Sequence, residues 1–71
     1  MIYRIRHNPT GLYVMGSGNK KSLSTNAKYF NTYPDSTKWG TLPRYKDQTI
    51  RIKDCVVESI KPQVISSGKL K

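Results

Sequence analysis

The sequence predicts a small, mainly β protein with at most one short helical turn. Its expected architecture is a curled antiparallel sheet or small barrel of four to five strands that opens with a β-hairpin. Apolar or aromatic side chains alternate with polar or basic ones over residues 2–7 and again over 48–54, which is the period of a strand. The chain shows no long amphipathic helical pattern and no internal repeat.

The first expected element is the hairpin. Alternation over 2–7 predicts its first strand, and turn-forming residues follow at 8–11. Pro9 presets the backbone for the first central turn position, and Gly11 can adopt the left-handed conformation that closes a bulged hairpin. Residues 12–15 then form the returning strand.

The middle of the chain is expected to hold an exposed loop at 16–22, a third strand at 27–33 and a short helical turn at 34–40. The loop consists of glycine, serine, asparagine and lysine, with nothing to bury. Pro34 and Gly40 suit the start and the end of the helical turn. A plain turn is the alternative, because serine and threonine are indifferent helix formers.

The last third of the chain returns to strands. Residues 48–54 alternate, and a bend is expected to separate them from a further strand at 56–60. A last short edge pairing is expected at 64–65. Residues 66–71 read as a flexible basic tail, so that 1–65 form a single domain.

Composition limits what the protein can be. Its 71 residues, 35% of them hydrophobic, predict one domain with a thin core. An enzyme is not expected, because so short a chain has little room for a buried catalytic site and its supporting residues. No run of about 18 apolar residues is present, and the N-terminal residues are too charged for a signal peptide. We therefore expect a cytoplasmic protein without a membrane partner.

Positive charge is the most informative feature. Thirteen Lys and Arg residues against four Asp and Glu residues make a formal net charge of +9. The charge is +7 over residues 1–46 and +2 over 47–71, which favours one strongly positive surface.

Basic residues interleaved with aromatic ones form the candidate binding surface. Arg4 and Arg6 share one face of the first strand, and Arg51 and Lys53 share one face of a later strand. Tyrosine rings beside such cations can stack on unpaired bases, and the loop lysines would add phosphate contacts. The candidate residues for binding nucleic acid or another polyanion are Arg4, Arg6, Lys20, Lys21, Lys28, Arg51, Lys53, Tyr13 and Tyr29.

The same side chains have a simpler interpretation as the solvated faces of two strands, which keep sheet edges from pairing. The net charge favours binding, because a solvated face needs charged side chains but no excess of +9. If about five of these residues contact duplex phosphates, affinity should fall roughly 10²–10³-fold between about 50 and 200 mM salt.

His7 and Cys55 have side chains suited to catalysis or metal binding, yet we expect neither to act. One Cys and one His cannot supply the usual four ligands of a structural zinc site. Cys55 would be a nucleophile only with a histidine brought alongside, and a buried structural thiol is the expected state. No metal or cofactor is predicted.

Four short motifs mark the first half of the chain. They are Tyr3-Arg4-Ile5-Arg6, Pro9-Thr10-Gly11-Leu12-Tyr13, Leu23-Ser24 and Lys28-Tyr29-Phe30. Their order resembles the opening of a loose group of small tailed-bacteriophage proteins, and the resemblance ends after Trp39. It implies a phage-encoded accessory protein made in the bacterial host cytoplasm, and it implies no functional residues.

The charge and the resemblance together predict a small phage protein that binds nucleic acid or a nucleoprotein complex, as a host-takeover or counter-defence inhibitor. Two alternatives stay open: an inhibitor that docks its positive face on an acidic surface of a host protein, and a minor structural phage protein. A homodimer joined edge to edge is also open, because short strands leave free edges around a thin core.

Overall fold

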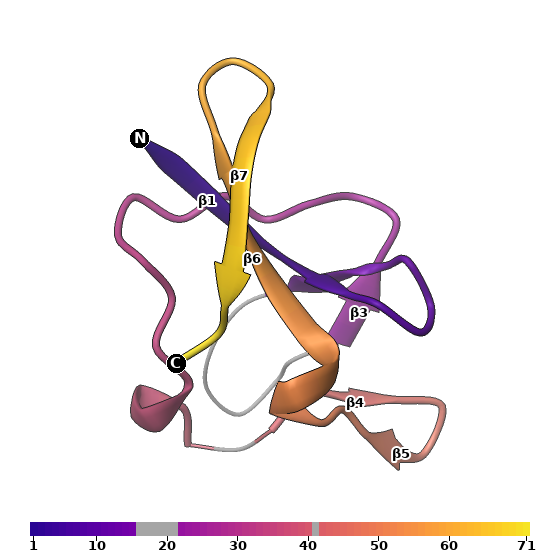
Figure 1. Ribbon diagram of the computed structural model, residues 1–71. Coiled ribbons are helices and arrows are strands. Elements are labelled where there is room, and N and C mark those ends of the chain that lie inside the picture. Colours follow the sequence, from indigo (N-terminus) through magenta and orange to yellow (C-terminus); the bar gives the residue numbers. More distant parts are fainter. Residues whose placement is uncertain (16–21, 41) are drawn as a thin grey trace.

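The computed structural model describes residues 1–15, 22–40 and 42–71, and it is mainly β. Five strands form one antiparallel sheet in the order β3-β2-β1-β6-β7 (Figure 1). They are β1 (Ile2–His7), β2 (Tyr13–Met15), β3 (Ser22–Ser24), β6 (Cys55–Ile60) and β7 (Val64–Lys69). β4 (Arg44–Tyr45) and β5 (Gln48–Thr49) form a separate two-stranded sheet. The expected fold class is confirmed, as an open sheet and not a barrel.

β1 and β2 form the expected opening hairpin. The His7 N–H donates to the Leu12 carbonyl at 2.7 Å, and the Gly11 N–H donates to the His7 carbonyl at 2.8 Å. Gly11 has a φ of +72°, the left-handed conformation that the turn sequence predicts. The buried His7 ring holds the turn through a 2.9 Å hydrogen bond between its Nδ1 and the Thr10 hydroxyl.

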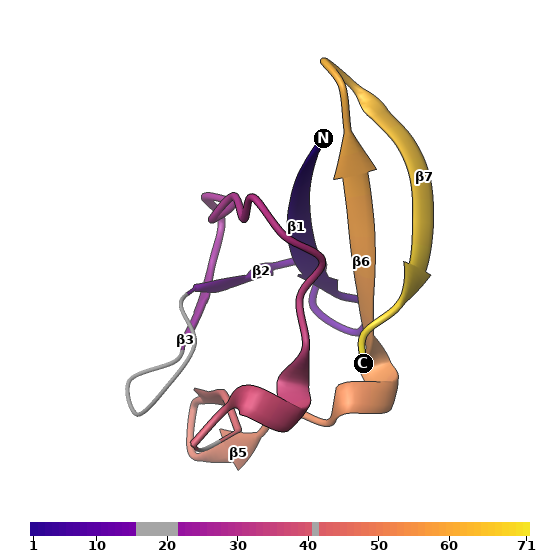
Figure 2. The same ribbon diagram turned by 90° about the vertical axis from the view of Figure 1, so that its left-hand side faces the viewer.

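One face of the large sheet forms the core. Ile5, Val14 and Val57 are fully buried on it. In Figure 2 the chain between β3 and β6 runs down beside β1 and then passes beneath the sheet. This connection packs aromatic side chains against the core, at Phe30, Tyr33, Trp39 and Tyr45. A long irregular segment therefore serves as the second layer of the fold.

The third strand expected at 27–33 is wrong. Only Phe30 pairs there, exchanging two backbone hydrogen bonds of 2.8 and 2.9 Å with Tyr3. The third strand is β3, which pairs with β2. The aromatic residues of 27–33 predicted a strand because they pack as strand residues do, but they reach the core from an irregular connection.

A short 3₁₀ helix, η1 (Ser36–Lys38), confirms the expected helical turn. Asp35 is its N-cap, and the carboxylate accepts hydrogen bonds from the Thr37 N–H at 3.0 Å and the Thr37 hydroxyl at 2.6 Å. These hydrogen bonds lower the pKa of Asp35 below its ordinary value. The Ser36 N–H donates to the Lys71 carbonyl at 2.6 Å, so the C-terminal residues lie against η1.

Residues 48–54 form a strand only at their start, which corrects a second expectation. β5 ends at Thr49, and the chain then enters a second 3₁₀ helix, η2 (Ile52–Asp54). Ile50 is buried and Ile52 packs against the core. The spacing of the two isoleucines predicted a strand, but a turn places both of them on the core equally well.

The C-terminal residues pair as a strand, so the flexible tail expected at 66–71 is also corrected. β7 pairs with β6 as far as Lys69, and Leu70 is buried. Gly68 lies under Tyr33, whose hydroxyl donates to the Lys69 carbonyl at 2.7 Å. A Cβ at Gly68 would lie 2.8 Å from that hydroxyl, so any larger residue would displace the Tyr33 side chain. No helix in the described ranges is long and apolar enough to cross a membrane.

Candidate functional site

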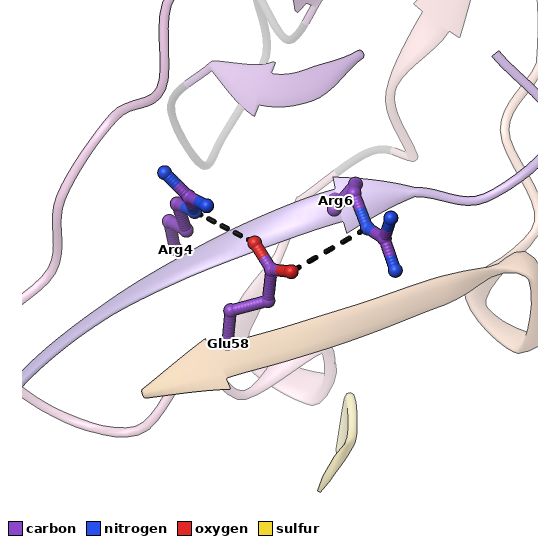
Figure 3. Close-up of polar contacts among 3 residues, drawn as sticks. All are labelled: Arg4, Arg6 and Glu58. Carbon is purple, nitrogen blue, oxygen red and sulfur yellow. Dashed lines mark hydrogen bonds and ion pairs between the residues drawn. The ribbon is translucent and has the colours of Figure 1, made fainter. Parts of the chain in front are cut away.

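Arg4 and Arg6 lie on the same side of β1, as the alternation predicts, but both point toward Glu58 on β6 (Figure 3). The Arg4 Nε donates to Glu58 Oε1 at 2.6 Å. The Arg6 Nε lies 3.6 Å from Glu58 Oε2, beyond hydrogen-bond distance. The Glu58 side chain is only 10% exposed, so two guanidinium groups cover one carboxylate.

This arrangement engages Arg4 in an ion pair with β6. Its side chain is 20% exposed, against 42% for Arg6. Partial burial opposes the charge of Arg4, but the hydrogen bond and charge of Glu58 outweigh it, so the pKa of Arg4 is raised. The Arg4 guanidinium also lies 4.6 Å from the centre of the Tyr13 ring. Arg4 and Tyr13 therefore contact each other across β1 and β2.

Tyr29 and Lys28 lie near the same region. Tyr29 is 56% exposed, and it lies close enough to Arg4 to help raise the pKa of that guanidinium. The Lys28 ammonium lies 5.8 Å from the centre of the Phe30 ring, and Phe30 pairs with β1 at Tyr3. Lys20 and Lys21 lie outside the described residues.

Arg51 and Lys53 do not share the face of a strand, which corrects the second expected pair. Arg51 is the N-cap of η2, Lys53 lies within that 3₁₀ helix, and both are exposed. In both ribbon views η2 lies at the same end of the molecule as η1 and the β4–β5 hairpin, away from the N-terminus and the β6–β7 connection (Figures 1 and 2). Arg51 and Lys53 thus belong to a different region from Arg4 and Arg6.

That end of the molecule gathers the exposed cations, and we call it the basic end. It comprises η1, the β4–β5 hairpin, η2 and the last residues of the chain, which the Ser36–Lys71 hydrogen bond ties to η1. Among the described residues it carries seven basic side chains, all exposed, against three acidic ones. The basic residues are Lys38, Arg44, Lys46, Arg51, Lys53, Lys69 and Lys71.

The basic end is held in place by local hydrogen bonds. Arg44 spans the β4–β5 hairpin, donating from Nη1 to the Thr49 hydroxyl at 3.2 Å and from Nη2 to the Asp47 carbonyl at 2.9 Å. The hairpin turns through Lys46 and Asp47, whose φ values of +49° and +64° are those of a tight two-residue turn. Backbone geometry therefore fixes where these charges are displayed.

Sequence reasoning identified two of the seven residues of the basic end. The other five lie in η1, in the β4–β5 hairpin and among the last three residues of the chain, where no alternation marks them. A local signal for the hairpin was also weak, because Lys46 and Asp47 replace the Asn-Gly or Asp-Gly pair typical of such a turn. Only the topology shows that residues 35–54 and 69–71 meet.

His7 and Cys55 are brought together after all, as opposite residues in the β1–β6 register. Both are buried, and the Cys55 thiol donates to the Arg51 carbonyl at 3.6 Å. Burial raises the pKa of Cys55 to about 11, so the thiol stays protonated at neutral pH and is a poor nucleophile. Within the described residues, no group of three or more His, Cys, Asp or Glu side chains could hold a metal ion.

Among the described residues, the basic end is a surface suited to a charged partner, whereas Arg4, Glu58 and Arg6 form an internally paired cluster. We compared the chain with models of protein families, with curated proteins and with solved structures. No family model matches it, and neither a curated protein nor a solved structure is significantly similar to it.

Proposed function

We propose that the protein binds nucleic acid through its basic end. The observation that carries this proposal is the gathering of seven exposed basic side chains on η1, the β4–β5 hairpin, η2 and the end of β7. One of the three acidic residues there, Asp35, is engaged as the cap of η1. A dense, fixed cationic surface of this kind is the usual counterpart of a phosphate backbone.

The contacts expected at the basic end are to phosphates. The Lys46 ammonium lies 5.4 Å from the centre of the Tyr45 ring, and the Lys71 ammonium lies 5.5 Å from that of Tyr33. These rings support cations and do not stand alone as stacking platforms. Phosphate contacts position a protein on nucleic acid without reading its bases, so we expect binding with little sequence preference.

Salt dependence is the direct test of phosphate contacts. Fluorescence anisotropy would be measured with labelled single-stranded RNA, single-stranded DNA and duplex DNA of one sequence. If about five basic side chains contact duplex phosphates, affinity should fall roughly 10²–10³-fold between about 50 and 200 mM salt. Micromolar protein without any binding at low salt would refute the proposal.

Two charge-matched double variants locate the surface. Lys46→Glu with Arg51→Glu changes the basic end, and Lys28→Glu with Lys61→Glu makes the same charge change at exposed residues elsewhere. We expect at least a tenfold loss of affinity from the first variant and a much smaller loss from the second. Equal losses would mean that net charge alone attracts the nucleic acid, and circular dichroism melts would verify folding in both.

The control also tests the site expected from the first half of the chain. Lys28 belongs to that site and not to the basic end, because it lies against Phe30 beside β1. A larger loss from the Lys28/Lys61 variant would move the interface to the region of Arg6 and Tyr29.

The wider role that we propose is that of a phage-encoded factor that disables a host nucleoprotein, and it rests on the resemblance of the opening motifs. A tagged protein expressed in a bacterial host should recover one complex whose nucleic acid is required for capture. Recovery that survives nuclease treatment would favour docking on an acidic protein surface instead.

A further inference from the structure

β7 is an open edge of the large sheet. It pairs with β6 on one side, and within the described ranges no strand pairs with its other side. Its residues 64–67 are all exposed. The opposite edge strand, β3, has only three residues, against six in β7. A long edge strand without proline is a template on which another extended chain can add.

The register shows which backbone groups of β7 face outward. Tyr3 directs its N–H and carbonyl toward Phe30, away from β6, so its partner Ser59 directs both groups toward β7. Ser59 is paired with Ser66, which therefore faces inward, and the next residue, Ser67, presents its N–H and carbonyl to the outside. The Lys69 carbonyl also faces outward, where it accepts the Tyr33 hydroxyl hydrogen bond.

An apolar pocket of about 560 Å³ lies beside the ends of β1 and β6, on the side of β7 away from its open edge. It is lined by Met1, Ile2, Tyr29, Ile60, Lys61 and Pro62. Ile60 pairs with Val64, the first residue of β7, and Val64 and the next residue, Ile65, are themselves 44% and 53% exposed. Exposed apolar surface gathered beside a free strand edge is typical of an interaction site.

The charge of β7 and of the residues that flank it in sequence favours an acidic partner. Residues 59–71 contain Lys61, Lys69 and Lys71 and no acidic residue. Lys61 and Lys69 stand at the two ends of the open edge. A second copy of the chain would bring its own charge of +9, whereas an acidic segment would be attracted.

We propose that the β7 edge binds an extended, acidic segment of a partner protein, which adds as a further strand and packs one apolar side chain against the exposed Val64 and Ile65. Backbone hydrogen bonds to Ser67 supply the strand pairing, and the exposed apolar residues and the lysines select the sequence. The edge shares Lys69 with the basic end, but its strand pairing involves none of the η1, η2 and β4–β5 elements, so the proposal goes beyond the proposed nucleic-acid binding.

The probe is a peptide of about eight residues that alternates valine and threonine, with a leucine anchor and aspartate at both ends. Amide exchange of the native protein is followed by NMR with and without this peptide. The Ser67 amide, which faces outward, should gain at least tenfold protection, while the Gly68 amide, already directed at β6, should change little. Absence of any change in β7 at millimolar peptide would overturn the proposal.

Two further arms identify the kind of binding. A peptide N-methylated at alternate residues should bind at least tenfold more weakly, and equal binding would refute strand addition. A peptide with lysine in place of aspartate should also bind at least tenfold more weakly, and equal binding would refute charge selection. Concentration-dependent dimerisation that protects the Ser67 amide without peptide would assign the edge to a second copy of the chain and overturn the proposal.

The matched variants are Ser67→Pro and Ser67→Ala. Proline removes the outward N–H without removing a hydrogen bond to β6, so it should abolish peptide binding, whereas alanine should leave binding unchanged. Both variants should bind nucleic acid as the unmodified protein does. Failure of peptide binding at β7 is therefore distinguishable from failure of the proposed nucleic-acid binding. Loss of peptide binding in Ser67→Ala as well would contradict backbone pairing. If Ser67→Pro fails to fold, the N-methylated peptide decides the question.

Discussion

Arg4 and Glu58 lie opposite each other in the β1–β6 register, and their side chains meet at 2.6 Å between Nε and Oε1. This ion pair neutralises part of the positive charge of β1 and stabilises the pairing of β1 with β6. Arg6 approaches the same carboxylate from the next position on that face but stays 3.6 Å away and more exposed. Replacing each of the three residues should therefore lower the free energy of unfolding by a different amount.

Glu58→Gln should destabilise the protein most among changes to this cluster, by about 1–3 kcal/mol, because it leaves two guanidinium groups without their carboxylate. Arg6→Gln should cost less than about 1 kcal/mol, as is usual for an exposed ion pair. Urea denaturation of both variants measures the difference. A larger cost for Arg6→Gln would contradict the order of the two contacts.

Gly68→Ala should destabilise the protein by about 1–2 kcal/mol, because the new methyl group would press on the Tyr33 hydroxyl. Tyr33→Phe removes that hydroxyl and its hydrogen bond to Lys69, at a cost of about 1 kcal/mol. When Gly68→Ala is combined with Tyr33→Phe, the glycine substitution should then add little further cost. A double-mutant cycle by thermal unfolding measures this coupling, and additive costs would show that the hydroxyl is not the obstacle.

Asp47→Gly should stabilise the β4–β5 hairpin by roughly 0.5–1 kcal/mol, because glycine adopts the φ of +64° without strain. Asp47→Ala makes the same charge change but tolerates positive φ less well than aspartate, so it should destabilise the protein. Chemical denaturation of the unmodified protein and both variants should give the highest free energy of unfolding with glycine at position 47, then aspartate, then alanine. A stabilising alanine would indicate that charge, and not backbone conformation, dominates at this turn.

Cys55 should resist alkylation in the folded protein. With its pKa raised to about 11, only about one thiol in a thousand is ionised near pH 8, against about one in ten at an ordinary value near 9. Iodoacetamide should therefore label native protein at least tenfold more slowly than urea-unfolded protein. Equal labelling rates would contradict a buried, protonated thiol.

The same raised pKa predicts how stability depends on pH. The folded state keeps the Cys55 proton longer than the unfolded state, so the stabilisation is complete below about pH 9 and is lost as pH rises toward about 11. The difference in free energy of unfolding between the unmodified protein and Cys55→Ala should narrow across that window. Comparison with the variant removes the pH dependence that the two proteins share, and a constant difference would refute the linkage.

Local patterns in the sequence were sufficient for the opening hairpin and for the class of the fold. Alternation over 2–7 and the turn chemistry around Gly11 act over a few residues, so they predicted β1 and β2 correctly. The same reasoning failed at 27–33 and 66–71. At 27–33, aromatic residues pack against the core from an irregular connection. At 66–71, pairing with β6 makes a strand from residues of low strand propensity.

Composition and alternation were enough to establish a small β domain with an excess charge of +9 and a single cysteine. Where that charge is displayed depends on the folded arrangement. Cross-strand pairing places Glu58 between Arg4 and Arg6, while the connections bring seven other cations, distant in sequence, to one end. Composition fixes how much charge a chain carries, but the distances that decide whether two charges neutralise or reinforce each other arise from long-range pairing.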